Sequence, residues 1–348
     1  MNYAIILAGG KGSRFWPLSR ECFPKQFLRI VNNQTLLEAA IKRAKIIIPP
    51  KNIFIVTSRP YLKEIINHLR KSAIPRSNII LEPVPKNTLP AIAICAQLIS
   101  LKDRWAKLLV FPSDHYIKDN AVFSRTMHKA LRICGKGLLC LMGIRPDKPA
   151  TGYGYIKTGK RIEEGVFYGK SFIEKPTAVK AAKLYKRKGI FWNSGMFCFT
   201  GISLLEEVRR HAPMLYTQIK GIKRRMDVAK IWPGIKPVSI DYGILEKSSN
   251  LAVVTAELSW CDLGSWDVLY DILPKDRDSN VRLCEYVGLG SNNNLICSSN
   301  AKRLIATIGL KETVIVDTPD ALLVCKKSEA QDIKRLVEVL KKKKKACV

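Results

Sequence analysis

The chain has 348 residues, of which 47% are hydrophobic and 25% are charged, a composition typical of a globular protein and not of a disordered one. Its 59 lysines and arginines outnumber its 29 aspartates and glutamates, and the resulting net charge of +30 favours an anionic partner. No apolar run approaches the roughly 20 residues of a membrane span and no secretory signal is visible, so we expect a cytoplasmic protein that does not bind a membrane.

Ten cysteines are spread along the chain without a Cys-x-x-Cys pair, and most lie in apolar segments. We expect buried, reduced thiols, in keeping with the cytoplasm, and no zinc site. The basic residues are spread as well, so we expect no specific binding of nucleic acid. The one dense block, residues 341–345, is interpreted as the solvated end of a helix, with a polyanion-binding arm as the alternative.

Short apolar strands alternate with amphipathic helices through the first two fifths of the chain. This alternation predicts a mainly parallel sheet with helices on both faces, in which ligands bind at the carboxyl ends of the strands. The expected strands are 3–8, 53–57, 78–81, 107–111 and 138–142, and the expected helices are 35–48, 61–69, 88–101 and 121–134.

The rest of the chain predicts a mixed segment and then a small β unit. Strands at 154–158, 166–174 and 196–200 are interleaved with helices, and the polar, turn-rich run 274–280 marks a boundary. Short strands follow, rich in valine, isoleucine and leucine, and a last helix is expected at 328–345 with Ser328 as its N-cap. We therefore expect a catalytic domain at 1–273 and a C-terminal β unit with a terminal helix at 281–348.

The loop after the first strand, residues 8–25, reads AGGKGSRFWPLSRECFPK. It does not match the Walker A pattern. It also lacks the third glycine of the dinucleotide fingerprint, because Phe15 stands at that position and Pro17 disfavours an immediate helix. The loop is nevertheless long, basic and glycine-rich at the end of a strand, where a functional loop is more common than a merely flexible one.

The residues of this loop are suited to a bound phosphate. Gly9, Gly10 and Gly12 would let backbone N–H groups approach an anion without a Cβ in the way. Arg14 and Lys25 would supply positive charge, the first in a bidentate contact and the second as a point charge. The composition therefore predicts a phosphate-binding loop.

Several polar residues at strand ends leave two interpretations open. Asp114 and Asp262 could hold a metal ion together, or each could simply stabilise a turn. The pair 87–88 could cap the next helix or contact a ligand. The pair 174–175 could be an exposed charge pair, and Asp241 could cap a helix.

The segment LAGGKGSRFWPLSR at 7–20, followed by PKQF at 24–27, resembles the signature of sugar-nucleotide pyrophosphorylases. The WPLSR and PKQF portions resemble one branch of them, the mannose-1-phosphate guanylyltransferases, also called GDP-mannose pyrophosphorylases. Similar segments continue over essentially the whole chain: EP and NT at 82–88, PSDH at 112–115, TGYGYI at 151–156, FIEKP at 172–176, WNSGMF at 192–197, SIDYGI at 239–244 and WCDLGSW at 260–266.

This resemblance implies an α/β nucleotide-diphospho-sugar transferase fold, a Rossmann-like mixed sheet with helices on both faces, extended by a small β-helix-like C-terminal unit. It implies GTP and mannose 1-phosphate as substrates and Mg²⁺ as cofactor, held by Asp114 and Asp262. The implied catalytic residues are Arg14, Lys25, Asp114, Lys175 and Asp262. The implied nucleotide-binding residues are Leu7, Ala8, Gly9, Gly10, Lys11, Gly12, Ser13, Arg14, Lys25, Asn87, Thr88, Ser113 and Asp114. The implied sugar-phosphate-binding residues are Tyr153, Gly154, Glu174, Lys175, Asn193 and Asp241.

The sequence departs from the family pattern at Lys86 and Leu89, beside the segment that the resemblance places at the guanine base. Many relatives also carry an isomerase domain of the cupin type, and because no His-rich cupin pattern is present we expect the transferase activity alone. We further expect a homodimer formed through the C-terminal β unit. The alternatives are a sister nucleotidyltransferase that uses another nucleotide or hexose phosphate, and a non-enzymatic basic protein that binds polyanions.

Overall fold

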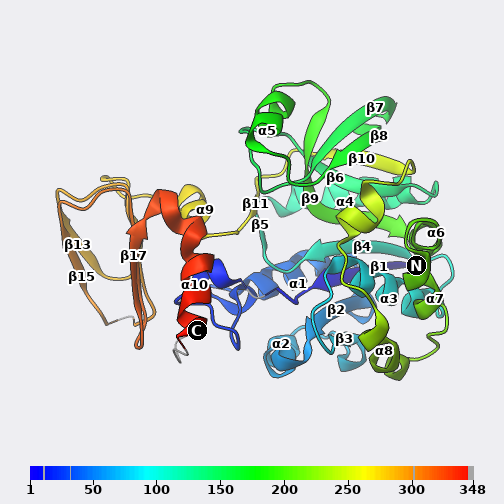
Figure 1. Ribbon diagram of the computed structural model, residues 1–348, viewed down its shortest axis with the longest axis horizontal. Helices are drawn as coiled ribbons and strands as arrows, with labels where there is room; N and C mark the ends of the chain where they lie inside the picture. Colours follow the sequence, from blue (N-terminus) through cyan, green and yellow to red (C-terminus); the bar gives the residue numbers. More distant parts are fainter. Residues whose placement is uncertain (11, 32, 301, 344–348) are drawn as a thin grey trace. The chain divides into compact units, whose positions relative to one another are not determined.

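A computed structural model describes residues 1–343 apart from residues 11, 32 and 301 (Figure 1). The chain forms two compact units, each built from separate segments. Unit 1 comprises Met1–Gly9, Ala40–Ser113 and Ile117–Trp260, and unit 2 comprises Gly10–Ala39, Asp114–Tyr116 and Cys261–Val348. The opening loop from Gly10 onward therefore belongs with the C-terminal part of the chain, although the expected domain boundary at 274–280 separates them in sequence.

Unit 1 is built on a nine-stranded mixed sheet with the strand order β3-β2-β1-β4-β9-β6-β10-β8-β7. The first four strands in this order, β3, β2, β1 and β4, are parallel to one another, and β6 is parallel to β10. Strand β9 is antiparallel to β4, β6 and β7. The strands are β1 Asn2–Leu7, β2 Ile53–Ser58, β3 Ile79–Glu82, β4 Lys107–Pro112, β6 Leu139–Ile144, β7 Tyr155–Glu163, β8 Val166–Ile173, β9 Ile190–Thr200 and β10 Leu251–Ala256.

The helices that the periodicity predicts form within one or two residues of their expected ends. They are α1 Leu36–Ile47, α2 Leu62–Leu69, α3 Thr88–Ser100 and α4 Asn120–Cys134. The segment after β7 adds α5 Ala178–Tyr185, α6 Gly201–His211, α7 Pro213–Ile219, α8 Arg225–Ile231 and one turn of π-helix, Asp241–Leu245.

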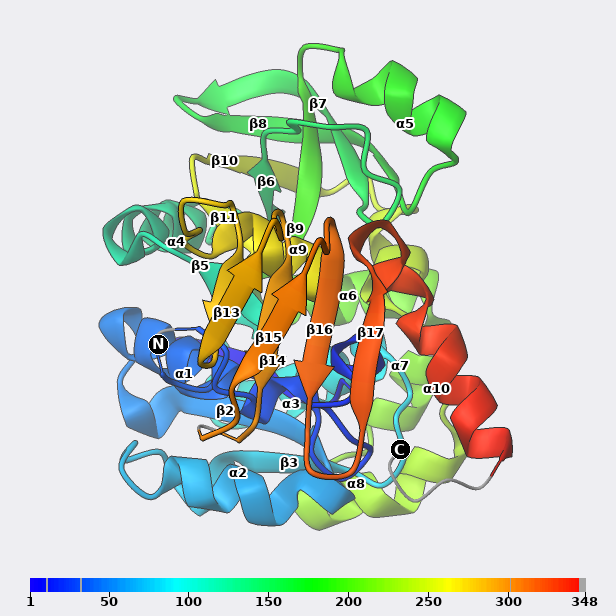
Figure 2. The same ribbon diagram turned by 90° about the vertical axis from the view of Figure 1, so that its left-hand side faces the viewer.

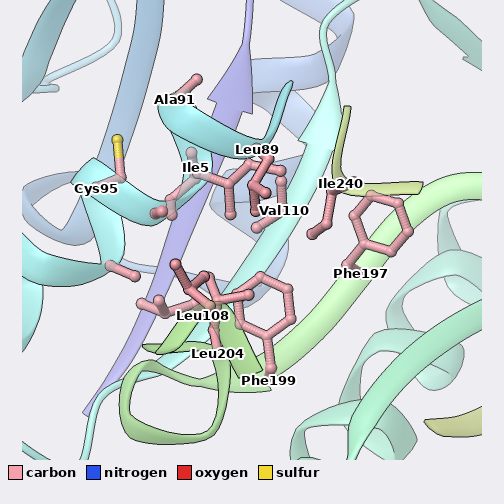
Figure 3. Close-up of a cluster of buried hydrophobic side chains, with 14 of the residues drawn as sticks. Ile5, Leu89, Ala91, Cys95, Leu108, Val110, Phe197, Phe199, Leu204 and Ile240 are labelled. Atoms are coloured by element: carbon pink, nitrogen blue, oxygen red, sulfur yellow. The ribbon is translucent and has the colours of Figure 1, made fainter. Parts of the chain in front are cut away.

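The alternation of side chains along β4 shows that helices cover both faces of the sheet. Leu108 and Val110 point into the cluster that α3 covers, which Figure 3 shows together with Ile5 and Leu89. Phe111, on the other side of the pleat, meets Phe123 of α4 with ring centroids 6.0 Å apart. Each fully buried side chain of this size contributes about 1.5–3 kcal/mol. The expected fold, a Rossmann-like mixed sheet with helices on both faces, is confirmed.

Unit 2 contains a short parallel β-helix, which Figure 2 shows from β13 to β17. β12, β14 and β16 are parallel neighbours, β13 and β15 form a second parallel pair, and β17 ends the larger sheet as an antiparallel strand. The β-helix-like extension is therefore confirmed. Its strands are β12 Val281–Leu283, β13 Tyr286–Leu289, β14 Leu295–Ser298, β15 Ile305–Ile308, β16 Thr313–Asp317 and β17 Leu322–Lys326; the short strands β5 His115–Ile117 and β11 Trp260–Asp262 pair separately.

The opening loop supplies part of the hydrophobic core of unit 2. Phe15 and Trp16 are buried in one cluster with residues of the β-helix such as Leu295 and Val314. The ring of Phe15 lies 4.9 Å from that of Trp266 in α9, Trp266–Ile272, and the Trp266 indole donates to the Trp16 carbonyl. The loop is thus anchored by packing and is not merely a surface connection.

The last helix begins later than expected. A 3-10 segment, Lys327–Asp332, precedes α10, Ile333–Lys342, and Ser328 lies inside that segment, so its prediction as an N-cap is wrong. Within the basic block, Lys341 pairs with Glu21, whereas residues 344 and 345 lie outside the described part of the chain. Across the described residues, no helix combines the length and the apolar character needed to cross a membrane.

Candidate active site

A buried lysine between two carboxylates is the main charged feature of unit 2. The Lys25 Nζ lies 2.9 Å from Asp114 Oδ2 and 3.5 Å from Asp262 Oδ1, and it also donates to the Leu263 carbonyl. Asp114 follows β4 and Asp262 is the last residue of β11, so two distant chain segments bring the carboxylates to one cation. The prediction that Asp114 and Asp262 act together is consistent with this geometry.

The charges of this group stabilise one another. Burial by itself favours the neutral amine, but Asp114 and Asp262 outweigh it and raise the pKa of Lys25. Burial likewise disfavours the Asp114 carboxylate, but Lys25 and His115 lower the pKa of Asp114 on balance. The Lys25 side chain is only 8% exposed, whereas Asp114 and Asp262 keep 27% and 38% of their side-chain surface. Both carboxylates can therefore accept a further cation from the solvent side.

The glycines of the opening loop differ in their backbone conformation and in the space around them. Gly12 has a φ of 61°, and a Cβ there would lie 2.5 Å from the Cβ of Lys25, so only glycine lets this lysine approach. Gly10 has open space where a Cβ would stand. Ser13 opens a 3-10 turn that includes the exposed Arg14, whose guanidinium reaches the turn at Gly264. The predicted residue Lys11 lies outside the described residues.

A second polar group lies at one end of the sheet in unit 1. The Asn193 carboxamide donates to Asp241 Oδ1 over 3.1 Å, and the Lys175 Nζ lies 2.6 Å from Glu174 Oε1. Gly154 lies against them, because a Cβ on it would be 2.6 Å from Glu174 Oε2 and 3.3 Å from the Asn193 Cβ. Five of the residues predicted to bind the sugar phosphate are therefore close to one another.

The charges in this second group are also interdependent. Burial, helped by the charge of Glu174, raises the pKa of Asp241 to about 6. Burial opposes the charge of Lys175, yet its hydrogen bond to Glu174 and the nearby Asp241 raise the pKa of Lys175. Asp241 opens the π-helix, a rare conformation that occurs often at functional sites. The group offers carboxylate and amide oxygens for hydroxyls and one ammonium for an anion.

Tyr153, the sixth predicted sugar-phosphate residue, lies in an aromatic group. Its ring meets those of Trp192 and Trp260 edge-on, with centroids 5.0 and 5.2 Å away. Since Asn193 follows Trp192 directly and its N–H donates to the Gly154 carbonyl, this packing fixes the turn beside the polar group.

Asn87 caps α3, which is the structural alternative that the sequence left open for the pair Asn87 and Thr88. The Asn87 side-chain oxygen accepts from the Thr88 N–H, and Thr88 Oγ1 accepts from the N–H of Ile240, one residue before Asp241. Lys86 is buried and donates to three backbone carbonyls, so its departure from the family pattern serves the packing of unit 1. Leu89 is buried against Gly243, where a Cβ would lie 2.5 Å from it.

The remaining predicted nucleotide-binding residues lie at the carboxyl edge of β1. Leu7 ends the strand, the Ala8 N–H donates to the Val56 carbonyl, and the Ser113 N–H donates to Leu7. The chain passes from unit 1 to unit 2 between Gly9 and Gly10, and again between Ser113 and Asp114. The predicted residues therefore fall into two sets, one in each unit.

Sequence reasoning assigned no role to Glu82 and did not single out Ser58. Glu82 is the last residue of β3 and is 6% exposed, and Ser58 is its paired residue on β2. A Cβ on Gly9 would lie 2.9 Å from Glu82 Oε2. In the sequence, the feature that could have pointed to Glu82 is its position as an acidic residue at the end of a buried apolar strand.

Two family models match the chain in succession. The model described as nucleotidyl transferase matches residues 3–279, and the one described as a MannoseP isomerase/GMP-like beta-helix domain matches residues 284–340. The first covers most of unit 1 together with the opening loop, and the second covers the β-helix of unit 2.

Curated relatives and a solved structure agree with these matches. A mannose-1-phosphate guanylyltransferase of Salmonella muenchen is 38% identical over 97% of this chain and 73% of its own length. A mannose-1-phosphate guanylyltransferase of Sinorhizobium fredii is 35% identical over 96% of this chain and 67% of its own length. A crystal structure described as a mannose-1-phosphate geranyltransferase from Thermus thermophilus is 31% identical and has a TM-score of 0.88 over 98% of this chain and 99% of that one. The chain therefore belongs to the nucleotidyl transferase family, in its mannose-1-phosphate guanylyltransferase branch.

Proposed function

We propose that the protein transfers GMP from GTP to α-D-mannose 1-phosphate and releases pyrophosphate, forming GDP-mannose. The identity of 35–38% to mannose-1-phosphate guanylyltransferases over nearly the whole chain carries this proposal. The two polar groups support it, because one offers positive charge beside a glycine-rich loop and the other offers hydrogen bonds suited to a sugar phosphate.

The reaction needs no covalent intermediate. An oxygen of mannose 1-phosphate attacks the α-phosphorus of GTP in line with the departing pyrophosphate, so the protein must align two anions that repel each other. Lys175 holds the incoming phosphate. Glu174, Asp241 and the Asn193 side-chain oxygen accept hydrogen bonds from the sugar hydroxyls, and the Asn193 amide can donate one. Lys25 and Arg14 stabilise the charge that grows on the leaving pyrophosphate.

Nucleotidyl transferases generally use a divalent metal ion. The carboxylates of Asp114 and Asp262 fit such an ion, because both lie next to the Lys25 ammonium and both remain partly exposed to solvent. Phosphate oxygens of the substrates would complete the oxygen shell. We propose Mg²⁺ as the ion, with Asp114 and Asp262 as its protein ligands. When bound, it would neutralise phosphate charge and polarise the phosphoryl group under attack. No group of three or more potential ligands occurs among the described residues.

A substrate panel tests the proposed reaction. Pyrophosphate release is measured with each of four nucleoside triphosphates paired with mannose, glucose and other hexose 1-phosphates. We expect GTP with mannose 1-phosphate to give the largest kcat/KM. A preference for another pair would assign the protein to a sister nucleotidyltransferase, and binding of polyanions without turnover would favour the non-enzymatic alternative.

We also propose a homodimer formed through the β-helix. Leu289 and Ile308 lie directly opposite each other on β13 and β15 and are 65% and 79% exposed, with Val287 beside them. An exposed apolar face of this kind is suited to burial against a second copy of the chain, because the same patch can cover itself across a twofold axis. Light scattering of the Ile308→Glu variant should show a monomer where the unchanged protein shows a dimer.

We propose the cytoplasm as the compartment. Nine cysteines lie in the described part of the chain, all are free thiols, and five of them are buried. Thiols of this kind persist where the medium is reducing. Thiol titration of protein unfolded directly in cell extract should find them all reduced.

A further inference from the structure

The turn that carries Glu174 and Lys175 has a strained backbone. β8 ends at Ile173, and Lys175 has a φ of 42°, in the left-handed region that residues other than glycine rarely adopt. Pro176 follows Lys175, and a residue before proline prefers an extended backbone, which adds to the strain. Such a conformation persists only where surrounding contacts hold it, so the fold must hold this turn in place.

The side chain of Glu246 supplies one such contact. Ile173 is the last residue of β8 that pairs with β7, so the backbone N–H of Glu174 lies beyond the ladder of the sheet. Glu246 Oε1 accepts a hydrogen bond from this N–H over 3.0 Å, across 72 positions of the sequence. A bond between a carboxylate and a backbone N–H is charge-assisted and therefore stronger than a neutral one. The contact fixes the residue directly before Lys175.

Glu246 is also joined to the other half of the polar group. It directly follows the π-helix, Asp241–Leu245, and its own N–H donates to the Asp241 carbonyl over 3.0 Å. Glu246 therefore connects the backbone that carries Asp241 to the turn that carries Glu174 and Lys175. The spacing of these two halves decides where a sugar phosphate can contact both of them.

The position of the backbone matters at Lys175 because its side chain is long and exposed. The Lys175 Nζ lies 2.6 Å from Glu174 Oε1 and the side chain is 59% exposed, so the direction in which it points depends strongly on its backbone. Displacement of a binding group by about 1 Å can cost up to about 10²-fold in rate. A residue that fixes the Lys175 backbone should therefore affect the anion that Lys175 holds.

We propose that Glu246 is a positioning residue for the sugar phosphate: it acts through Lys175, whose backbone it holds by way of the Glu174 N–H. The inference rests on the proposed function, since it takes mannose 1-phosphate as the ligand of Lys175. Glu246 is exposed and belongs neither to the group around Lys25 nor to the predicted nucleotide-binding residues, so its loss should leave the binding of GTP unchanged.

The test compares the unchanged protein with Glu246→Ala and Glu246→Gln in steady-state kinetics with GTP and mannose 1-phosphate. Glu246→Ala removes the acceptor and should raise the KM for mannose 1-phosphate by roughly 10-fold, while the KM for GTP changes by less than about twofold. In Glu246→Gln the carboxamide oxygen still accepts from the Glu174 N–H, so the KM for mannose 1-phosphate should stay within about threefold of the original value. The control is Glu164→Ala, in the exposed turn between β7 and β8, which should leave both KM values unchanged.

A double-mutant cycle with Lys175→Ala shows whether Glu246 acts through that lysine. In the Lys175→Ala background, Glu246→Ala should raise the KM for mannose 1-phosphate by less than about twofold, because the group that Glu246 positions is gone. Effects that multiply fully in the double variant, a Glu246→Gln protein as impaired as Glu246→Ala, or an equal rise in both KM values would each overturn the inference. An unchanged protein that does not turn over GTP with mannose 1-phosphate would refute the proposed function, whereas these outcomes refute only the role of Glu246.

Discussion

Lys175 has an exposed ammonium next to a buried carboxylate, Glu174, with side-chain exposures of 59% and 7%. Its proposed ligand, the phosphate of the sugar, carries its charge before the reaction begins. Lys175→Ala should therefore raise the KM for mannose 1-phosphate by roughly 10- to 100-fold, the cost of one charged hydrogen bond, and leave the KM for GTP nearly unchanged. Steady-state kinetics in which each substrate is varied in turn will measure both.

The matched control for Lys175 is Lys180→Ala, an exposed lysine of α5 that should behave as the unchanged protein. If Lys175→Ala raises the KM for GTP and leaves the KM for mannose 1-phosphate unchanged, the assignment of this lysine to the sugar phosphate is wrong.

The carboxylates of Asp262 and Asp114 both form ion pairs with the Lys25 ammonium. Asp262→Asn keeps the shape of the side chain but removes its charge, so it should lower kcat by about 10²-fold or more and raise the metal concentration needed for half-maximal activity. Titration of activity with Mg²⁺ measures the second effect. Asp271→Asn, in the exposed part of α9, provides the control, and equal Mg²⁺ requirements in the two variants would remove Asp262 from the proposed metal ligands.

Glu82 makes folding dependent on pH. Burial raises the pKa of Glu82 from 4.5 to about 7 in the folded protein. Between these values the unfolded chain has released a proton that the folded chain still binds, so the free energy of unfolding falls as the pH rises. The loss approaches about 3 kcal/mol above pH 7, since one unit of pKa corresponds to about 1.4 kcal/mol.

Glu82→Gln removes this penalty. Urea unfolding without nucleotide should show that the free energy of unfolding of the variant rises relative to that of the unchanged protein from about pH 5 to about pH 8. A constant difference across this range would show that the Glu82 carboxyl titrates normally.

At the scale of elements, the turns of the β-helix depend on two buried asparagines. The Asn280 side-chain oxygen accepts from both the backbone and the side chain of Asn294, and Asn294 in turn donates to the Leu310 carbonyl and accepts from the Thr313 N–H. One asparagine thus satisfies backbone groups of the next coil. This stack explains why asparagine separates these strands in the sequence.

Asn294→Ala leaves the buried N–H of Thr313 without its partner, whereas the Leu310 carbonyl still accepts from the N–H of Asn292. We expect the free energy of unfolding to fall by about 1–3 kcal/mol, the cost of one unsatisfied buried group. Asn300→Ala, in an exposed turn of the same unit, should cost much less. Denaturant unfolding of both variants gives the comparison, and equal losses would show that the buried stack adds nothing to stability.

At the scale of the whole molecule, the opening loop and the β-helix share one hydrophobic core although about 250 residues separate them in sequence. Trp16 and Trp266 illustrate this, since the indole of the second donates to the carbonyl of the first over 250 positions. A fragment that ends before the β-helix, residues 1–280, would lose Leu295, Val314 and Val337 from that core.

We therefore expect the 1–280 fragment to lose activity, and its tryptophan emission to shift to longer wavelength as Trp16 and Trp266 become exposed. Circular dichroism will show whether the sheet of unit 1 persists. An active fragment would instead support the linear division into a catalytic domain at 1–273 and a separate unit at 281–348.

The sequence by itself determined the repeating elements and the residue types of the two polar groups. Hydrophobic periodicity predicted α1 to α4 closely because local spacing decides which face of a helix is buried. The glycine-rich loop, the strand-end aspartates and the EKP segment indicated phosphate chemistry because few residue types can perform it.

Only the tertiary structure decided which distant residues meet. It placed Lys25 between Asp114 and Asp262, set Gly12 against Lys25 and Gly9 against Glu82, and packed the opening loop with the β-helix. It also delayed α10 to Ile333, past the expected cap at Ser328. These outcomes depend on contacts between residues far apart in the chain, and local propensity carries no information about such contacts because their energies arise only when the segments pack together.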